Sequence, residues 1–125
     1  MAARRLPSSV VAALDAAKIL GIRAGTGDHR FIGIWVVVAE GRVFVRSYTR
    51  KPQSWWRTFL DDPRGEIQVG SRTIRIRATQ VRSERLRKAV DRAYADKYNT
   101  PGSLNYVRSF RLPARRATTT ELVRR

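Results

Sequence analysis

An apolar run followed at once by a turn and an alternating run sets the strongest limit on the fold of this chain. The run FIGIWVVVA, Phe31 to Ala39, has hydrophobic side chains at both odd and even positions, which is typical of a strand covered on both faces. The turn AEGR, Ala39 to Arg42, follows it, and Arg42 to Tyr48 then alternates as a strand does. Strands joined by so short a turn pair antiparallel. The sequence therefore predicts a hairpin made of a central strand and its antiparallel neighbour.

The remaining segments alternate between helical and extended patterns. Ser8 or Ser9 is predicted to cap a first helix that ends at Gly21, and Ser83 is predicted to cap a later helix running to about Tyr98. The other predicted elements are a short strand and turn in IRAGTGD, a short helix over Ser54–Leu60, a hairpin of Glu66–Val69 with Arg72–Thr79, and a last strand over Ala117–Val123. This order predicts one α+β domain, residues 1–125, built around a small antiparallel sheet or barrel with flanking helices.

Composition excludes several kinds of site and leaves two interpretations of the charge. The 125 residues include no cysteine, so a disulfide framework, a thiolate metal site and a cysteine nucleophile are excluded. The net charge is +16, from 26 Lys and Arg residues against ten Asp and Glu residues. Such a balance arises from the amino-acid usage of a GC-rich genome, or it serves a polyanionic partner such as nucleic acid, an acidic membrane surface or a phosphorylated ligand.

No segment has the pattern of a membrane span or a signal peptide. The longest apolar run, Ile32 to Ala39, is far too short to cross a bilayer. Asp15 and Lys18 interrupt the apolar patch near the N-terminus, which is unlike the core of a signal peptide. We therefore expect a soluble, cytoplasmic protein.

The usual catalytic side chains are missing from the sequence. His29 is the one histidine, and it has no partners at the spacing of a triad or a zinc site. The segment GTGDHR lacks the third glycine of a dinucleotide fingerprint, and Asp61 and Asp62 are better explained as residues that close a short helix before Pro63 than as an acid–base pair. If the protein is an enzyme, we expect a bound cofactor, and no metal, to supply the chemistry.

A cluster of cations and hydroxyls at the end of the second predicted strand is the candidate binding site. Arg46, Ser47, Thr49, Arg50 and Lys51 lie within six residues. Phosphate groups bind through several short N–H···O and O–H···O bonds, and arginine offers a planar fork of donors. The cluster therefore predicts an anion site that holds a phosphorylated small molecule.

Aromatic residues follow the cationic cluster directly. Trp55 and Trp56 open the short predicted helix, where one of them is able to pack against a flat ring. We expect Trp56 or Phe59 to face the core and Trp55 to lie nearer the ligand. On a later strand, Arg75 and Arg77 share one face; the solvated side of a half-buried strand explains them better than a contact with a phosphate backbone.

Three stretches carry a resemblance to a known superfamily. They are HRFIGIWVVVAEGRVFVRSYTRKPQSWWRTFLDDPRGEIQVGSRTIRIRATQV, DRAYADKY and ATTTELV. Together they resemble the FMN-binding split-barrel superfamily, which contains pyridoxamine-phosphate oxidases and deazaflavin-dependent nitroreductases. Among its subgroups, the bacterial family called domain of unknown function 2255 is the most similar.

The resemblance implies a small split barrel of about six strands, and a homodimer with ligand sites at the subunit interface. It implies that Arg46, Ser47, Arg50 and Lys51 hold the phosphate of FMN or a deazaflavin, with Arg30 as a weaker match. Trp55 or Trp56 occupies the place of an aromatic residue that begins the following helix in the deazaflavin relatives.

Three hypotheses about function follow from these observations. The first is an oxidoreductase that binds FMN or a deazaflavin. The second is a dimeric barrel without a cofactor and without catalysis. The third is a basic module that binds nucleic acid, although the sequence contains no familiar nucleic-acid motif and no run of alternating aromatic residues.

Overall fold

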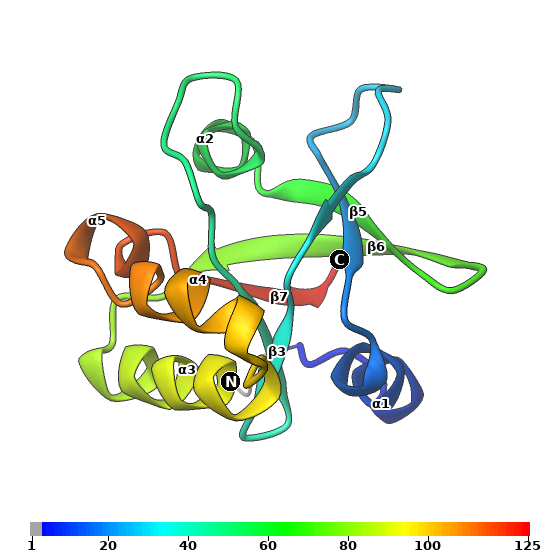
Figure 1. Cartoon of the computed structure of the whole chain (residues 1–125). Helices are drawn as coiled ribbons and strands as arrows, with labels where there is room; N and C mark the ends of the chain where they lie inside the picture. The colour runs from blue at the N-terminus through cyan, green and yellow to red at the C-terminus, as the bar shows by residue number, and fades with distance from the viewer. Residues whose placement is uncertain (1–3) are drawn as a thin grey trace.

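The structure, a computed structural model, describes residues 4–125 as a curled sheet with helices packed around it (Figure 1). Residues 1–3 of the predicted domain lie outside the described residues. The elements are α1 (Ser8–Ala16), β1 (Leu20–Ala24), β2 (Ile32–Ile34), β3 (Val37–Ala39), β4 (Arg42–Val45), α2 (Trp55–Asp61), β5 (Arg64–Val69), β6 (Arg72–Gln80), α3 (Glu84–Lys97), the 3-10 helix η1 (Pro101–Ser103), α4 (Leu104–Ser109), α5 (Pro113–Arg116) and β7 (Thr120–Arg124).

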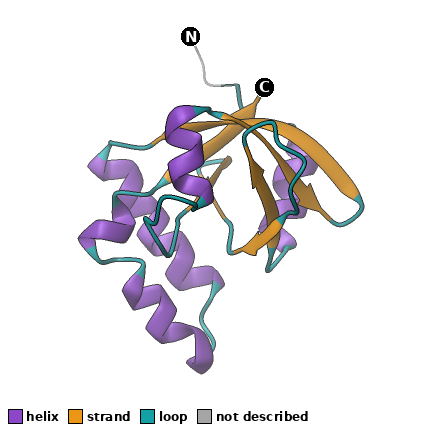
Figure 2. Cartoon of the chain, turned by 90° about the horizontal axis from the view of Figure 1, so that it is seen from above, coloured by secondary structure: helices purple, strands orange, loops and turns teal. Residues whose placement is uncertain are grey.

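The sheet is antiparallel throughout and forms a half-barrel. Within residues 4–125 it has seven strands in the order β2-β1-β5-β6-β7-β4-β3, and it curls around its own inner face (Figure 2). Its two edge strands, β2 and β3, follow each other directly in the sequence. The α+β class and the antiparallel split-barrel architecture with flanking helices are thereby confirmed.

The apolar run at residues 31–39 forms two short edge strands, and the prediction of a single central strand is wrong. The chain leaves the sheet at Trp35 and Val36, so that β2 and β3 lie at opposite edges. The hydroxyl of Tyr98 accepts a hydrogen bond from the Val36 N–H at 3.1 Å, and the Lys97 Nζ donates to the Val36 carbonyl at 2.9 Å. These side chains satisfy the backbone groups that a neighbouring strand would otherwise pair. The break raises the strand number from about six to seven.

The predicted hairpin itself is confirmed. Ala39 pairs with Arg42 across the β3–β4 turn. The two turn residues, Glu40 and Gly41, have φ angles of 56° and 71°, as a two-residue type I′ turn requires. The turn therefore fixes the register that pairs Arg42 to Phe44 with β3.

All three predicted helices form, with shifts at their ends. Ser83 caps α3 through a side-chain hydrogen bond, as predicted. Ser54, predicted as the first residue of the short helix, instead caps α2 in the same way. The predicted cap at Ser8 or Ser9 is wrong, because Pro7 precedes α1 and no side chain caps it. Helix α1 already ends at Ala16, so the prediction that Gly21 stops it is wrong, since Gly21 lies within β1. The last strand begins only at Thr120. The sequence did not predict α4 and α5, which are too short to show helical periodicity.

Two apolar cores lie on opposite sides of the chain around β4. Val43 and Val45 face the core inside the half-barrel, while Phe44 faces a second core that α3 and α4 cover. Val36 and Val37 divide between the same two cores. Burial on both faces is therefore the physical reason for the continuous apolar pattern that the sequence shows here.

Candidate functional site

An open cavity of about 450 Å³ lies where three separate segments meet. Its walls are residues 32–35, which form β2 and the start of the break, residues 46–49 and 54–55, which connect β4 to α2, and Tyr106 and Phe110 of the α4 region. Cavities of this size bind cofactors and other small molecules. The cavity is therefore the candidate site, and it includes part of the predicted anion site.

The segments around this cavity contain no acidic residue. Residues 29–39, 41–60 and 97–120 are each free of Asp and Glu, and each carries Arg or Lys. All the residues that line the cavity come from these segments. Since no carboxylate of the walls opposes it, a negatively charged ligand is favoured here by the summed field.

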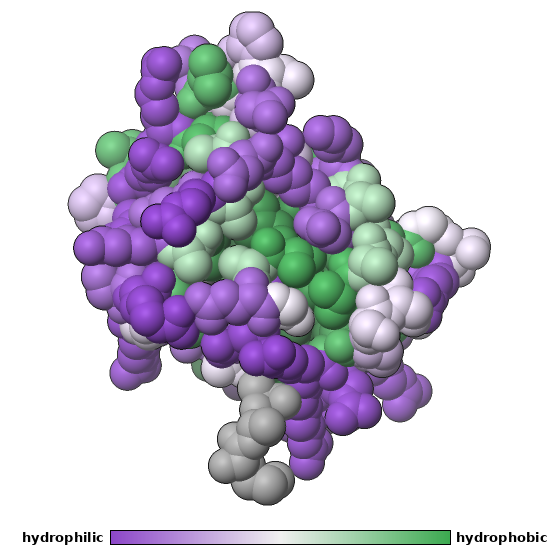
Figure 3. Space-filling model, turned by 90° about the horizontal axis from the view of Figure 1, so that it is seen from below, coloured by the Kyte–Doolittle hydropathy of each residue, from purple (hydrophilic) through white to green (hydrophobic). Residues whose placement is uncertain are grey.

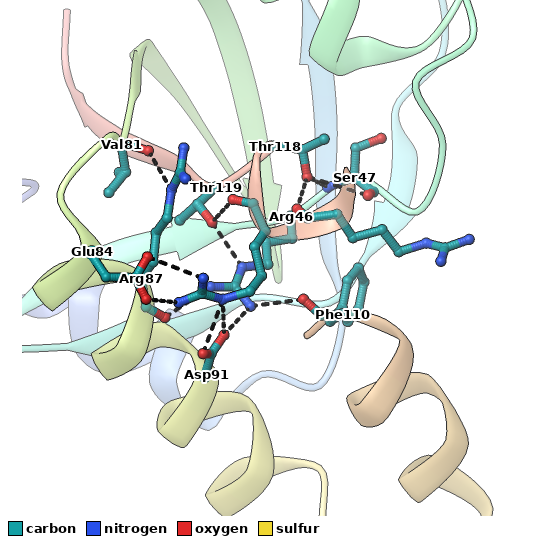
Figure 4. A network of polar contacts seen from close by, with 11 residues as sticks. Arg46, Ser47, Val81, Glu84, Arg87, Asp91, Phe110, Thr118 and Thr119 are labelled. Atoms are coloured by element: carbon teal, nitrogen blue, oxygen red, sulfur yellow. Dashed lines mark hydrogen bonds and ion pairs between the residues drawn. The ribbon is translucent and has the colours of Figure 1, made fainter. Parts of the chain in front are cut away.

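Arg46 lies beneath the cavity and is fully engaged by the protein (Figure 4). It is buried, with 2% of its surface exposed. Its guanidinium donates hydrogen bonds to Asp91 Oδ1 (2.6 Å), Thr119 Oγ1 (2.9 Å) and the carbonyls of Phe110 (3.0 Å) and Arg87 (2.9 Å). Burial lowers the pKa of Arg46, and the bond to Asp91 opposes that shift. The role of Arg46 in cofactor binding stays a prediction, but its fork of donors faces protein acceptors.

The same network continues to the surface through Arg116, which contacts Asp91 at 3.1 Å and Glu84 at 2.8 Å. The hydrogen bond to Glu84 raises the pKa of the Arg116 guanidinium, and the same contact lowers the pKa of the Glu84 carboxyl. The network joins β4, α3 and the start of β7, and it supports the floor of the cavity.

Ser47 and Thr49 shape the turn that borders the cavity. The Ser47 N–H donates to Thr118 Oγ1 at 2.9 Å, and the Ser47 hydroxyl donates to the Thr49 carbonyl. The Thr49 hydroxyl accepts from the Lys51 N–H at 3.2 Å. Both residues line the cavity, so their predicted place beside a ligand agrees with the geometry, while their contact with a phosphate stays a prediction.

The other predicted cations lie outside the walls of the cavity. Arg50 and Lys51 are exposed on the loop that follows Thr49, and Arg30 is exposed just before β2. The Arg50 guanidinium lies 5.6 Å from the centre of the Trp56 ring. Of the seven predicted site residues, Arg46, Ser47, Thr49 and Trp55 line the cavity, and Arg30, Arg50 and Lys51 do not.

The two adjacent tryptophans at the start of α2 make different contacts. Ser54 caps the helix by accepting from the Arg57 N–H. Trp55 lines the cavity, whereas the Nε1 of Trp56 donates to Gln80 Oε1 at 2.9 Å. Trp55, Trp56 and Phe59 are all buried, yet the cavity beside Trp55 stays open. Neither tryptophan fills the site.

An aromatic wall is the part of the site that sequence reasoning missed. Trp35 stacks on Tyr98 with ring centroids 4.0 Å apart and an angle of 6° between planes. Tyr106 lies edge-on to Trp35 at 6.0 Å, and Phe110 lies edge-on to Tyr48 at 6.0 Å. The spacing of Tyr106 and Phe110, four residues apart, was the available signal. This spacing places two rings on one side of a helix, but the sequence did not predict a helix over these residues.

Comparison with known proteins assigns the chain to a family. A family model described as an uncharacterized protein conserved in bacteria (DUF2255) matches residues 10–122. The chain belongs to this family. The family named by the sequence resemblance is thereby confirmed.

A solved structure supports the fold of this DUF2255 chain. The chain is similar to the conserved hypothetical protein Rv2991 from Mycobacterium tuberculosis, with a TM-score of 0.59 and 12% sequence identity, over 96% of this chain and 79% of that one. At this identity the likeness shows the fold alone. No curated protein matches the sequence.

A second hollow of about 500 Å³ lies on the underside of the DUF2255 chain, between α1 and α3. Apolar side chains line its floor and polar ones surround it (Figure 3). Val38 and Ala39 of β3 belong to it, and Asp96, Arg92 and Lys97 of α3 add charges of both signs. Its mixed charge gives no preference for an anion. This distinguishes it from the cavity beside Trp55.

The remaining sequence expectations concern His29 and the membrane. His29 is exposed and lines a small hollow of about 190 Å³, to which Trp55 and Ile32 also belong. Among residues 4–125, none of the helices combines the length and the apolar character that a bilayer crossing requires.

Proposed function

We propose that this DUF2255 protein binds FMN or a deazaflavin in the aromatic cavity and acts as an oxidoreductase with that cofactor. The observation that carries the proposal is an open cavity with aromatic walls that adjoins a loop rich in hydroxyls and cations. The cofactor, when bound, supplies the redox chemistry. The side chains of this chain bind it and orient it.

The shape of the cavity supports a flat ring system as the ligand. Trp35, Tyr48, Trp55 and Phe110 contribute ring surfaces to its walls. Rings of this kind hold a planar heterocycle by offset stacking and edge contacts. The volume of about 450 Å³ lies within the range of small-molecule sites.

The loop after β4 supports a phosphate on that ligand. Thr49 borders the cavity, and Arg50 and Lys51 follow it with exposed side chains. Their flexible stems allow them to reach an anion at the edge of the cavity. Arg46 supports the floor of the cavity from below, and its donors serve Asp91 and three other acceptors, so we assign the phosphate to the loop.

The proposal includes a homodimer, in which a second copy of the chain packs against the cavity. Ile32, Tyr48 and Tyr106 line the cavity and remain about half exposed, at 45%, 50% and 52%. Exposed apolar groups gathered at one place indicate an interaction surface. The resemblance to split barrels, which place ligand sites between subunits, supports a homodimer formed at this face.

The proposal is tested by comparing FMN with riboflavin, which lacks the phosphate. The variant R50A/K51A should weaken FMN binding by at least roughly tenfold, because two charge-assisted contacts are lost, and should leave riboflavin binding unchanged. The variant R82A/K88A removes two exposed cations elsewhere and is the matched control. Isothermal titration measures the affinity of wild type and of both variants for each of the two ligands.

Two results would contradict the site. Wild-type protein that binds neither FMN nor the deazaflavin at high micromolar concentration would support a cofactor-free barrel instead. Equal loss of FMN affinity in R50A/K51A and in the control would show that only net charge matters.

A further inference from the structure

Arg115, in α5, does not line the aromatic cavity itself, but two contacts hold it against Tyr48, which lines the cavity and is half exposed. Its guanidinium lies over the Tyr48 ring, 4.2 Å from the ring centre, and its Nε donates to the Tyr48 carbonyl at 3.0 Å. Stacking and a hydrogen bond together fix the plane of the guanidinium. Arg115 is therefore oriented before any ligand arrives.

The two terminal nitrogens of Arg115 are free to bind an anion. Among residues 4–125, they form no hydrogen bond and no ion pair with a carboxylate. The neighbouring Arg116 instead takes up the nearby acids Glu84 and Asp91. A free guanidinium edge with four N–H donors matches the paired oxygens of a carboxylate, sulfonate or phosphate.

Two half-exposed rings border the same place. Tyr48 and Tyr106 both line the cavity, with ring centroids 6.0 Å apart. Each residue is half exposed in the single chain, so a planar molecule at the mouth can cover apolar surface on both, and in the proposed dimer it lies between the subunits. No acidic residue occurs in the segments that carry these tyrosines and Arg115.

We propose that the mouth of the cavity binds an aromatic acid as a second ligand, besides the cofactor. The ring of this ligand packs against Tyr48 and Tyr106, and its acid group pairs with Arg115. Only the identification of this ligand as the substrate rests on the proposed function. Its binding does not require the cofactor.

The test uses a pair of fluorescent probes that differ in charge. 8-Anilinonaphthalene-1-sulfonate carries an acid group, and N-phenyl-1-naphthylamine has the same rings without it. Wild-type protein should bind the anionic probe roughly tenfold more tightly than the neutral one. 1-Naphthoate should displace the anionic probe, and neutral 1-naphthylmethanol at the same concentration should not.

Variants of Arg115 test whether this residue binds the acid group of the probe. R115A should remove the preference for the anionic probe, and R115K, which keeps the charge but loses the planar fork, should retain part of it. R82A, an exposed cation on another face, should behave as wild type. Thermal unfolding of each variant establishes that the probe reports binding by the folded chain.

FMN titration of the same variants separates the second ligand from the cofactor. R115A should keep FMN affinity within about threefold of wild type. An equal loss of FMN and probe affinity would place Arg115 in the phosphate site of the cofactor and overturn the proposal. Unchanged probe preference in R115A, or no preference in wild type, would also overturn it. Absence of FMN binding alone would contradict only the proposed cofactor.

Discussion

At the scale of single residues, Arg46 shows how one side chain supports a site without facing it. Its guanidinium donates four hydrogen bonds. Two go to Asp91 and Arg87 of α3, one to Phe110 directly after α4, and one to Thr119 just before β7. The sequence shows the cation and its hydroxyl neighbours. It does not show the direction of the guanidinium, because Asp91, Phe110 and Thr119 lie 45, 64 and 73 residues away.

Replacement of Arg46 should therefore act on stability. R46A leaves Asp91 with Arg116 as its ion-pair partner and removes the Arg46 donors to the Phe110 and Arg87 carbonyls, so we expect a loss of about 3 kcal/mol in the free energy of unfolding. R85A breaks an exposed ion pair with Glu40 and should cost at most about 1 kcal/mol. Urea denaturation measures both. Equal stability of the two variants would contradict the structural role of Arg46.

At the scale of elements, the break between β2 and β3 positions the site. It turns Trp35 onto Tyr98 and makes residues 32–35 a wall of the cavity. The apolar pattern correctly indicated burial on both faces around Val36 and Val37. It could not indicate the break, since that depends on Lys97 and Tyr98, which lie more than 60 residues away in the sequence. The local signal of Ser83 was sufficient for the start of α3, whereas the start of α1 follows Pro7 and not a serine cap.

Tyr94 of α3 and Tyr98, which caps the C-terminal end of α3, give a matched test of that break. The Tyr98 hydroxyl accepts from the Val36 N–H and lies 2.7 Å from the Lys18 carbonyl, so Y98F should destabilise the fold by about 1–3 kcal/mol. The Tyr94 hydroxyl is buried with no hydrogen-bond partner in residues 4–125, and burial raises its pKa. Y94F should be neutral or slightly stabilising. Chemical denaturation that ranks the variants in the opposite order would contradict this explanation.

At the scale of the whole molecule, the excess of positive charge surrounds the few carboxylates. Arginine partners lower the pKa of the Glu84 carboxyl and, through Arg23, that of Glu66, below the usual 4.5. A lowered pKa in the folded state means that the unfolded chain binds more protons as the pH falls. These ion pairs therefore contribute stability above about pH 4.5 and lose it below.

We expect the urea concentration at the midpoint of unfolding to be lower at pH 3.5 than at pH 7. Added salt should restore part of this loss at pH 3.5, because salt screens the repulsion among the cations that remain. An unchanged midpoint over this range would contradict the role of the ion pairs.

The proposed dimer belongs to the same scale. The variant Y106D places a charge on the exposed aromatic surface at the cavity mouth and should shift the protein from dimer to monomer. L60D introduces the same charge at Leu60, which is 46% exposed on α2 and does not line the cavity, and should leave the dimer intact. Light scattering after size exclusion measures the mass. A wild-type monomer at high micromolar concentration would contradict the dimer.

The measurement that decides the proposed function is the titration of FMN into wild-type protein, followed by the quenching of flavin fluorescence. Contact with the aromatic walls should quench the flavin in a saturable way, with one FMN bound per chain at micromolar concentration, and R50A/K51A should weaken that binding. A deazaflavin titration covers the alternative cofactor. Linear, unsaturated signals for both cofactors up to high micromolar concentration would contradict a flavin-binding function for this cavity.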